Sequence, residues 1–333
     1  MKTLKSRKST IFILLSLLVV SIILQGCGNK EETKSSGSDK ATPTVLNYGF
    51  VGTKEPGGIE GWGFHTGIIQ EVLKEYGVTE VNLYPFQTGP DLNESVISER
   101  IDLGSSGDSP AVLAKSSGAD TRIISFSNAQ VGTAIIGRKD GPQTVEELKG
   151  GTVGVVKGSL MHRFLVDYLA WKGVEDVNIM NINSIPDTEA ALLRGEIEAY
   201  AVPTYYYSGY KLIQDGHPIL GQSSENADFF SVSVVYARQA YIDGFPNLQE
   251  AWHKALEKSY ADLTSKPDEY YAWLSGNTGA SVDEVKILNP IENLPTEYVS
   301  SEAIARLNNT KEFLIKEKLA KNDFDTNEWV LQP

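Results

Sequence analysis

Residues 45–237 alternate between two hydrophobic patterns. Short runs of apolar and β-branched residues predict strands, and apolar residues at helical spacing, such as Ile68, Ile69, Val72 and Leu73, predict helices between them. The predicted strands are 45–51, 81–86, 101–104, 122–127, 133–137, 153–156, 177–182, 198–202 and 231–237. The predicted helices are 64–76, 91–100, 111–116, 160–171, 187–194 and 204–214.

From residue 239 onward the pattern is mainly helical, and residues 52–63 read as a Gly-rich loop. Two segments, Thr144–Glu147 and Ser281–Glu284, have the sequence of a capping box, in which the first and fourth side chains each bond the other residue's backbone N–H. Strands separated by helices indicate an α/β fold with parallel strands. There are too many such units for one small sheet.

A strand–turn–helix segment at Ile101–Ala114 is repeated in kind at Val153–Leu165. In the first copy we expect Ser109 to cap a helix that begins at Pro110, with Asp108 just outside it. The free N–H groups of such a helix start can receive an anion. Since ligands of open α/β sheets lie beyond the carboxyl ends of the strands, two facing lobes would direct both helix starts into one cleft. The alternative is an ordinary turn that bonds only to itself and water.

The N-terminus has the layout of a secretory signal. Basic residues in 2–8 precede an apolar run, 11–24, that is shorter than the about 20 residues of a membrane span. The run ends in Leu-Gln-Gly-Cys27, which resembles the lipobox of bacterial lipoproteins. We expect residues 1–26 to be a signal peptide and Cys27 to carry a lipid such as palmitate that anchors the protein on the extracytoplasmic face of the cell membrane. An uncleaved anchor helix is the alternative. The polar residues 27–44 predict a flexible tether.

Composition narrows the possible functions. The 333 residues carry a net charge of −13, which argues against a nucleic-acid partner because phosphate binding needs clustered Lys and Arg. Cys27 is the only cysteine, and the four histidines lack the paired spacing of metal ligands. The sequence holds neither a Gly-x-Ser-x-Gly elbow nor a Walker loop. We therefore expect no metal, no cofactor and no enzymatic activity.

Much of the mature chain, residues 45 to about 220, resembles the substrate-binding proteins of bacterial ABC importers for sulfonates, taurine and nitrate. The resemblance is carried by Leu46–Phe50, Ile101–Pro110, Gly118–Asp120, Thr144–Gly150, Val153–Ser159 and Ala190–Glu198. It implies a two-lobed periplasmic-binding-protein fold of type II, in which each lobe is a mixed sheet flanked by helices. Lobe 1 would comprise residues 45–130 and 231–333, lobe 2 residues 131–230, and the hinges would lie near 130–132 and 228–231.

The resemblance also implies a function. The lobes would close over a small organic anion, an aliphatic sulfonate or taurine, and the monomer would deliver it to the permease of an ABC importer. Nitrate, an aromatic acid or a thiamine precursor are alternative ligands, and an enzyme like the pyrimidine synthases of thiamine formation, or a lipoprotein sensor or adhesin, is an alternative function. The segment 201–207 lacks the acid that sulfonate-binding members often carry before the proline, and the loop 52–63 is unusually long and aromatic. These two departures leave the identity of the ligand open.

Strand ends and helix starts supply the candidate ligand-binding residues. They are Trp62, Gln87, Ser106, Gly107, Asp108, Ser109, Asn128, Gly158, Ser159, His162 and Tyr205. Trp62 is equally compatible with a packing role, and His162 with a solvated or capping role. Asp108 is unexpected beside an anion, so we expect it either to orient its loop or to bind the amine of a zwitterion such as taurine.

Overall fold

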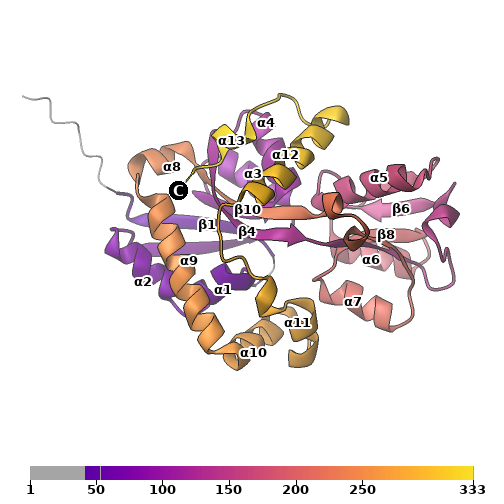
Figure 1. Cartoon of the computed structure of the whole chain (residues 1–333), viewed down its shortest axis with the longest axis horizontal. Coiled ribbons are helices and arrows are strands. Elements are labelled where there is room, and N and C mark those ends of the chain that lie inside the picture. Colours follow the sequence, from indigo (N-terminus) through magenta and orange to yellow (C-terminus); the bar gives the residue numbers. More distant parts are fainter. Residues whose placement is uncertain (1–41, 53, 333) are drawn as a thin grey trace, which may run out of the picture. The chain divides into compact units, whose positions relative to one another are not determined.

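The computed structural model describes residues 42–52 and 54–332. The predicted signal peptide, Cys27 and most of the predicted tether lie outside the described residues. Two five-stranded mixed sheets, with helices on their faces, form the framework (Figure 1). Within the described ranges, none of the helices combines the length and the apolar character needed to cross a membrane.

The first sheet has the strand order β2-β1-β3-β10-β4. Its strands are β1 (Val45–Val51), β2 (Glu80–Phe86), β3 (Leu103–Gly107), β4 (Thr121–Val131) and β10 (Ser231–Arg238). β1 pairs in parallel with β2 and β3, whereas β10 pairs antiparallel with β3 and β4. Its helices are α1 (Gly58–His65), α2 (Ile68–Glu75), α3 (Gly89–Ile97), α4 (Asp108–Ser116), α8 (Gln239–Gly244), α9 (Leu248–Ser265), α10 (Pro267–Thr278), α11 (Val282–Leu288), α12 (Ser301–Lys316) and α13 (Thr326–Trp329).

The second sheet has the order β7-β6-β8-β5-β9. Its strands are β5 (Thr133–Gly137), β6 (Thr152–Val155), β7 (Asn178–Asn181), β8 (Ala199–Pro203) and β9 (Ile219–Gln222), and its helices are α5 (Leu160–Lys172), α6 (Ile185–Leu193) and α7 (Tyr207–Gln214). The chain passes from the first sheet to the second at Gly132, between β4 and β5, and returns between β9 and β10. The antiparallel β4 and β10 are neighbours, so the two crossings leave the first sheet from adjacent strands.

Apolar side chains are buried on both faces of the first sheet. On one face, Tyr48 is fully buried and its ring stacks on Trp252 of α9 at 5.5 Å between centroids. On the other face, residues of α3, α4 and α12 pack around Phe126. Figure 1 shows α9 and α12 on these opposite faces. Because both faces are covered, successive residues of β10, such as Val234, Val235 and Tyr236, are buried.

The first helices differ from the prediction in their boundaries. The second half of the predicted loop 52–63 is helical, because its glycines serve close packing: a Cβ on Gly61 would overlap the carbonyl of Pro56. The predicted helix 64–76 is divided by Gly67, whose φ of 81° requires a left-handed backbone. The strand β9 was not predicted, since its four residues form too short an apolar run.

The helix α4 begins at Asp108, two residues before the predicted start, and Gly107 is its N-cap residue. The prediction that Ser109 caps this helix is therefore wrong, and Asp108 and Ser109 lie inside the first turn. The predicted capping box at Thr144 is also absent: no side-chain bond caps the short 3-10 helix there, and the Glu147 carboxylate instead accepts from the backbone N–H of Gln143.

The second predicted capping box, at Ser281, is confirmed. The Ser281 hydroxyl accepts from the N–H of Glu284 at 3.3 Å, and the Glu284 carboxylate accepts from the N–H of Ser281 at 2.8 Å. Ser281→Ala is expected to lower the unfolding free energy by about 1 kcal/mol, because one orphan N–H of α11 loses its acceptor. Urea denaturation measures this loss. Thr144→Ala is the matched control, and an equal loss there would contradict the explanation.

Candidate functional site

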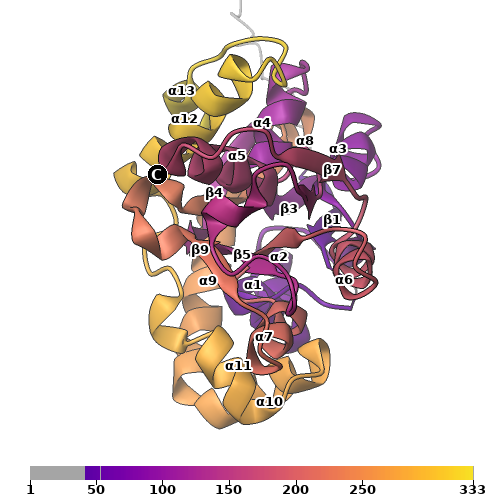
Figure 2. The ribbon, with the colours of Figure 1, turned by 90° about the vertical axis from the view of Figure 1, so that its right-hand side faces the viewer.

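A cavity of about 770 Å³ is lined by residues from both sheets. Its wall includes the carboxyl-terminal ends of β1 and β3 and residues that follow β2, β6 and β8, which is where ligands of α/β sheets bind. Helices of the two sheets also meet beside it: α4 and α12 contact α5, and α7 contacts α11 (Figure 2).

Six helices begin at the wall of this cavity. Each contributes a residue from its first turn or N-cap: Gly58 of α1, Gly89 of α3, Gly107 of α4, Ser159 of α5, Ile185 of α6 and Tyr206 of α7. A helix N-terminus carries a partial positive charge and unpaired N–H groups, and it favours an anion by about 0.3–1 kcal/mol when exposed and up to about 2 kcal/mol when partly buried. The cavity therefore favours a negatively charged group.

The starts of α4 and α5 approach each other closely. A Cβ on Gly107 would lie 2.7 Å from the side chain of Leu160, so a larger residue here would require that side chain to shift. Ser159 caps α5: its hydroxyl accepts from the N–H of His162 at 3.3 Å and donates to the carbonyl of Val156 at 2.6 Å. The two strand–turn–helix segments that resemble each other in the sequence thus direct their helix starts to one place.

Three glutamates and one arginine line the cavity. Arg306 of α12 is the one Lys or Arg among the described lining residues, and it donates to the carbonyl of Ala129 and to Glu302, the latter at 2.6 Å. Glu292 and Glu60 supply the remaining carboxyl groups. Burial raises the pKa of Glu60 to about 7, although hydrogen bonds from Tyr48 and Ser105 act in the opposite direction.

Six of the predicted residues lie in the wall of this cavity. They are Gln87, Ser106, Gly107, Asn128, Ser159 and Tyr205. The side-chain oxygen of Asn128 accepts from the N–H of Gln130 at 2.8 Å, and this bond does not use its amide nitrogen. Tyr205 is 38% exposed, and its ring lies 5.3 Å from that of Tyr206. That these residues contact a ligand stays a prediction.

The structure places Trp62, Asp108 and Ser109 outside the cavity wall. Trp62 is buried, donates its indole N–H to Asp262 at 2.9 Å and packs edge-on against Tyr270, as a packing anchor does. Asp108 and Ser109 are fully buried. The Asp108 carboxylate accepts from the backbone and hydroxyl of Ser109 and from groups on two other elements, so its role here is to hold the loop.

Gly158 and His162 also lie outside the cavity wall. Gly158 has a φ of 79°, a backbone conformation that suits glycine, and its N–H donates to the ring nitrogen Nδ1 of His162 at 3.4 Å. Burial, together with the nearby Lys157, lowers the pKa of His162 to about 4, so the imidazole is neutral at pH 7. Its ring packs edge-on against Phe313. A charged imidazole at the start of α5 is thus disfavoured.

Sequence reasoning missed several lining residues, above all Glu60 and Arg306. Glu60 lies in the segment read as a loop, and its only signal is a carboxylate between apolar residues and glycines. Arg306 lies on α12, far along the chain from the predicted site residues, and nothing in its local sequence links it to the cleft. Both reach the cavity only through the tertiary fold.

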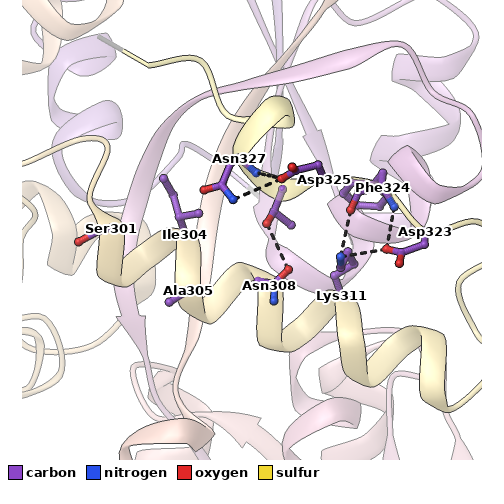
Figure 3. Close-up of a pocket in the computed structure, with 10 residues that line it drawn as sticks. Ser301, Ile304, Ala305, Asn308, Lys311, Asp323, Phe324, Asp325 and Asn327 are labelled. Carbon is purple, nitrogen blue, oxygen red and sulfur yellow. Dashed lines mark hydrogen bonds and ion pairs between the residues drawn. The ribbon is translucent and has the colours of Figure 1, made fainter.

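A second hollow, of about 700 Å³, lies between α12 and α13 (Figure 3). Its polar groups are bonded to one another: Lys311 donates to the carbonyl of Phe324 at 3.0 Å and pairs with Asp323 at 2.9 Å, as Figure 3 shows. None of the predicted site residues lines it. Among the described residues, no three His, Cys, Asp or Glu side chains are grouped as metal ligands would be.

Two mixed α/β sheets joined by two crossings, with a cavity at the ends of their strands, define the periplasmic-binding-protein fold. A solved aliphatic sulphonate-binding protein, SsuA of Escherichia coli, has this fold with a TM-score of 0.67 and 22% identity over 86% of this chain and 97% of that one. The alkanesulfonate-binding protein SsuA of Xanthomonas axonopodis pv. citri, solved with MOPS, has a TM-score of 0.71 and 20% identity over 88% and 100%. The desulfurization enzyme DSZB has a TM-score of 0.67 and 15% identity over 86% and 96%. These likenesses establish the fold.

The chain belongs to the NMT1/THI5-like family, whose sequence profile matches residues 61–270. It is 28% identical to a protein of Escherichia coli K12 named for binding aliphatic sulfonates, over 186 residues that make up 53% of this chain and 57% of that protein. A protein of Bacillus subtilis 168 with the same name is 23% identical over 325 residues, 95% of this chain and 93% of that one. The family resemblance predicted from the sequence is thus confirmed.

Proposed function

We propose that this protein is an extracytoplasmic solute-binding protein that captures a small organic anion, an aliphatic sulfonate or taurine, for an ABC importer. The observation that carries the proposal is the convergence of six helix N-termini on one cavity. A sulfonate presents three oxygens that accept hydrogen bonds, and it stays ionised at any physiological pH. Binding needs desolvation and hydrogen bonds but no covalent step. The names of the Escherichia coli and Bacillus subtilis relatives support this ligand class.

The proposal extends to the location and the motion of the protein. Residues 45–130 with 231–333, and residues 131–230, would act as two lobes that close over the ligand by bending near the crossings, a motion typical of hinged proteins. Cys27 would carry the lipid anchor, and the closed monomer would dock on the permease. The lipobox-like sequence supports the anchor, and a Cys27→Ala variant that stays in the membrane fraction would contradict it.

Tryptophan fluorescence of the mature protein tests the ligand class. Trp62 lies in α1, whose start lines the cavity, and Trp273 packs edge-on against it at 5.8 Å between ring centroids, so ligand binding is expected to change the emission. Titration should give saturable changes with alkanesulfonates or taurine and none with nitrate or a pyrimidine precursor of thiamine. Saturation with nitrate or the pyrimidine, and silence with every sulfonate, would overturn the proposal.

Asn128→Asp is expected to weaken sulfonate binding by at least about 10-fold. The two side chains have the same shape, but aspartate adds a negative charge to the cavity wall, where it repels the ligand and competes for the helix N-termini. Isothermal titration calorimetry measures the change. Asn178→Asp, on the exposed strand end of β7, adds the same charge away from the cavity and should leave the affinity within about threefold. Equal losses in both variants would contradict a local effect.

A further inference from the structure

Glu60 is a buried residue of the cavity wall, and one of its two carboxyl oxygens is unpaired. It is the third residue of α1, its side chain lines the cavity, and the residue is 4% exposed. Its Oε2 accepts from the hydroxyl of Tyr48 at 2.6 Å and from that of Ser105 at 3.2 Å. Its Oε1 is buried and has no hydrogen-bond partner. A buried polar atom without a partner is costly, so this oxygen requires an explanation.

Tight packing around Glu60 holds its carboxyl group in place. Tyr48 is fully buried, and its ring packs against Phe64 at 4.8 Å and Trp252 at 5.5 Å, which holds the hydroxyl bonded to Oε2 in place. The start of α1 is also tightly packed, since the carbonyl of Pro56 leaves no room for a side chain at Gly61, the residue after Glu60. The carboxyl group is therefore held with Oε2 paired and Oε1 without a donor.

We infer that Oε1 of Glu60 accepts a hydrogen bond from an ammonium group of the ligand, so that the bound molecule is a zwitterion whose acidic group lies at the helix N-termini. The inference deepens the proposed function and rests on it for the acidic group. An ammonium supplies both the missing donor and a compensating charge. Arg306, the one cationic side chain among the described lining residues, is already bonded to Glu302 and to a backbone carbonyl, so a ligand ammonium is the better donor to Glu60. The amine that the sequence led us to seek at Asp108 is thus reassigned to Glu60.

The raised pKa of Glu60 agrees with this assignment. Burial raises the pKa of Glu60 to about 7, so the neutral and the ionised carboxyl group are both populated at neutral pH. A bound ammonium would favour the ionised form. The competing role is that of a protonated Glu60 which donates its O–H to the anionic group itself. The two roles predict opposite preferences between ligands with and without an amine.

Two pairs of ligands separate these roles. Taurine and 1-propanesulfonate differ only in that an ammonium replaces a methyl group, and β-alanine and butyrate form the same pair with a carboxylate. Calorimetry at pH 8, where Glu60 is mostly ionised, is expected to show that taurine binds at least about 10-fold more tightly than 1-propanesulfonate, since a site with a buried acceptor rejects a ligand that leaves it unpaired. Equal affinity, or preference for 1-propanesulfonate, would overturn the inference.

Glu60→Gln provides the second measurement. Tyr48 and Ser105 both donate at Oε2, so they will hold the amide oxygen there and leave the amide N–H₂ facing the ligand. The acceptor becomes a donor at unchanged volume. We expect the affinity for taurine to fall by at least about 10-fold and that for 1-propanesulfonate to stay within about threefold. Glu71→Gln, an exposed residue of α2, is the matched control and should change neither affinity.

The four ligands also distinguish this inference from the proposed function. Tight binding of 1-propanesulfonate without an amine preference would support sulfonate capture and overturn the role of Glu60. Binding of β-alanine but not butyrate, with no binding of either sulfonate, would support Glu60 and overturn the sulfonate assignment. Binding of none of the four would overturn both. Equal losses of affinity for taurine and for 1-propanesulfonate in Glu60→Gln would show that Glu60 supports the fold and does not contact the ligand.

Discussion

Asp108→Ala lowers the unfolding free energy by about 3–5 kcal/mol, the range expected when a buried, fully bonded carboxylate is removed. Asp108 is 0% exposed. Its carboxylate accepts from the N–H of Ser109 at 2.6 Å, the N–H of Val232 at 3.2 Å and the hydroxyl of Thr310 at 2.7 Å. Alanine leaves these buried donors without acceptors. It also removes the residue that joins α4, β10 and α12.

The same network reaches the second sheet. Arg163 of α5 donates to the hydroxyl of Thr310 at 3.1 Å and to the carbonyl of Asp228 at 2.6 Å, so a cation and a carboxylate share Thr310 between them. Removal of Asp108 therefore disturbs the contact between α5 and α12 as well as the loop itself. Hydrogen-bond networks of this kind lose more than one bond when one member is removed.

Guanidinium denaturation of the mature protein measures the loss. Asp140→Ala, at an exposed turn after β5, is the matched control and should stay within about 0.5 kcal/mol of the wild type. The loss of unfolding free energy in Asp108→Asn is expected to lie between those of Asp108→Ala and Asp140→Ala, because the amide keeps one acceptor but directs its N–H₂ at a donor. A loss below about 1 kcal/mol for Asp108→Ala would show that water replaces the carboxylate.

Glu60→Gln is expected to gain stability relative to the wild type as the pH rises from 4.5 to 7. The unfolded carboxyl has a pKa of 4.5, and burial raises the pKa of the folded one to about 7. Between these values the folded protein keeps a proton that the unfolded chain has released. The contribution of this group to the unfolding free energy of the wild type is therefore greatest below pH 4.5. It falls by about 3 kcal/mol as the pH rises past 7.

Glutamine has no proton to lose, so the difference between the two proteins isolates this one group. Urea denaturation at several pH values should show the difference in unfolding free energy growing by about 3 kcal/mol in favour of Gln. The lowered pKa of His162 makes the folded state more stable as the pH rises over the same range, but both proteins contain His162, so its effect cancels in the difference. The exposed Glu71→Gln should give a flat difference. A flat difference for Glu60→Gln would mean that its carboxyl is hydrated.

The sequence predicted the elements well where the signal is local. The strand β1 was predicted at its observed bounds, because a run of apolar and β-branched residues reports burial directly. The start of α5 at Leu160 was also predicted, because a helix start depends on residues within one turn, and Ser159 is its cap. The α/β class followed from the alternation of these elements. The prediction failed at α1, where the glycines are used for close packing rather than for a loop.

The candidate site could be predicted only in part. Gln87, Ser106 and Ser159 were found because the ends of parallel strands and the starts of the next helices meet at one edge of a sheet. Asp108, next to these residues in sequence, was placed in the site for the same reason. Its actual role depends on Thr310, 202 residues further along the chain, which no local pattern reveals.

The sequence alone therefore determined the fold class, the resemblance to its family and the convergence of the α4 and α5 helix starts. Each of these depends on hydrophobic spacing, caps and turns that act within a few residues. Only the tertiary structure decided which carboxylate is fully paired within the fold and which keeps an unpaired oxygen in the cavity wall. Asp108 lies among donors from three elements and is fully paired, whereas Glu60 has donors on one oxygen and none on the other. Hydrogen-bond pairing between distant segments, and not residue type, assigns the two roles.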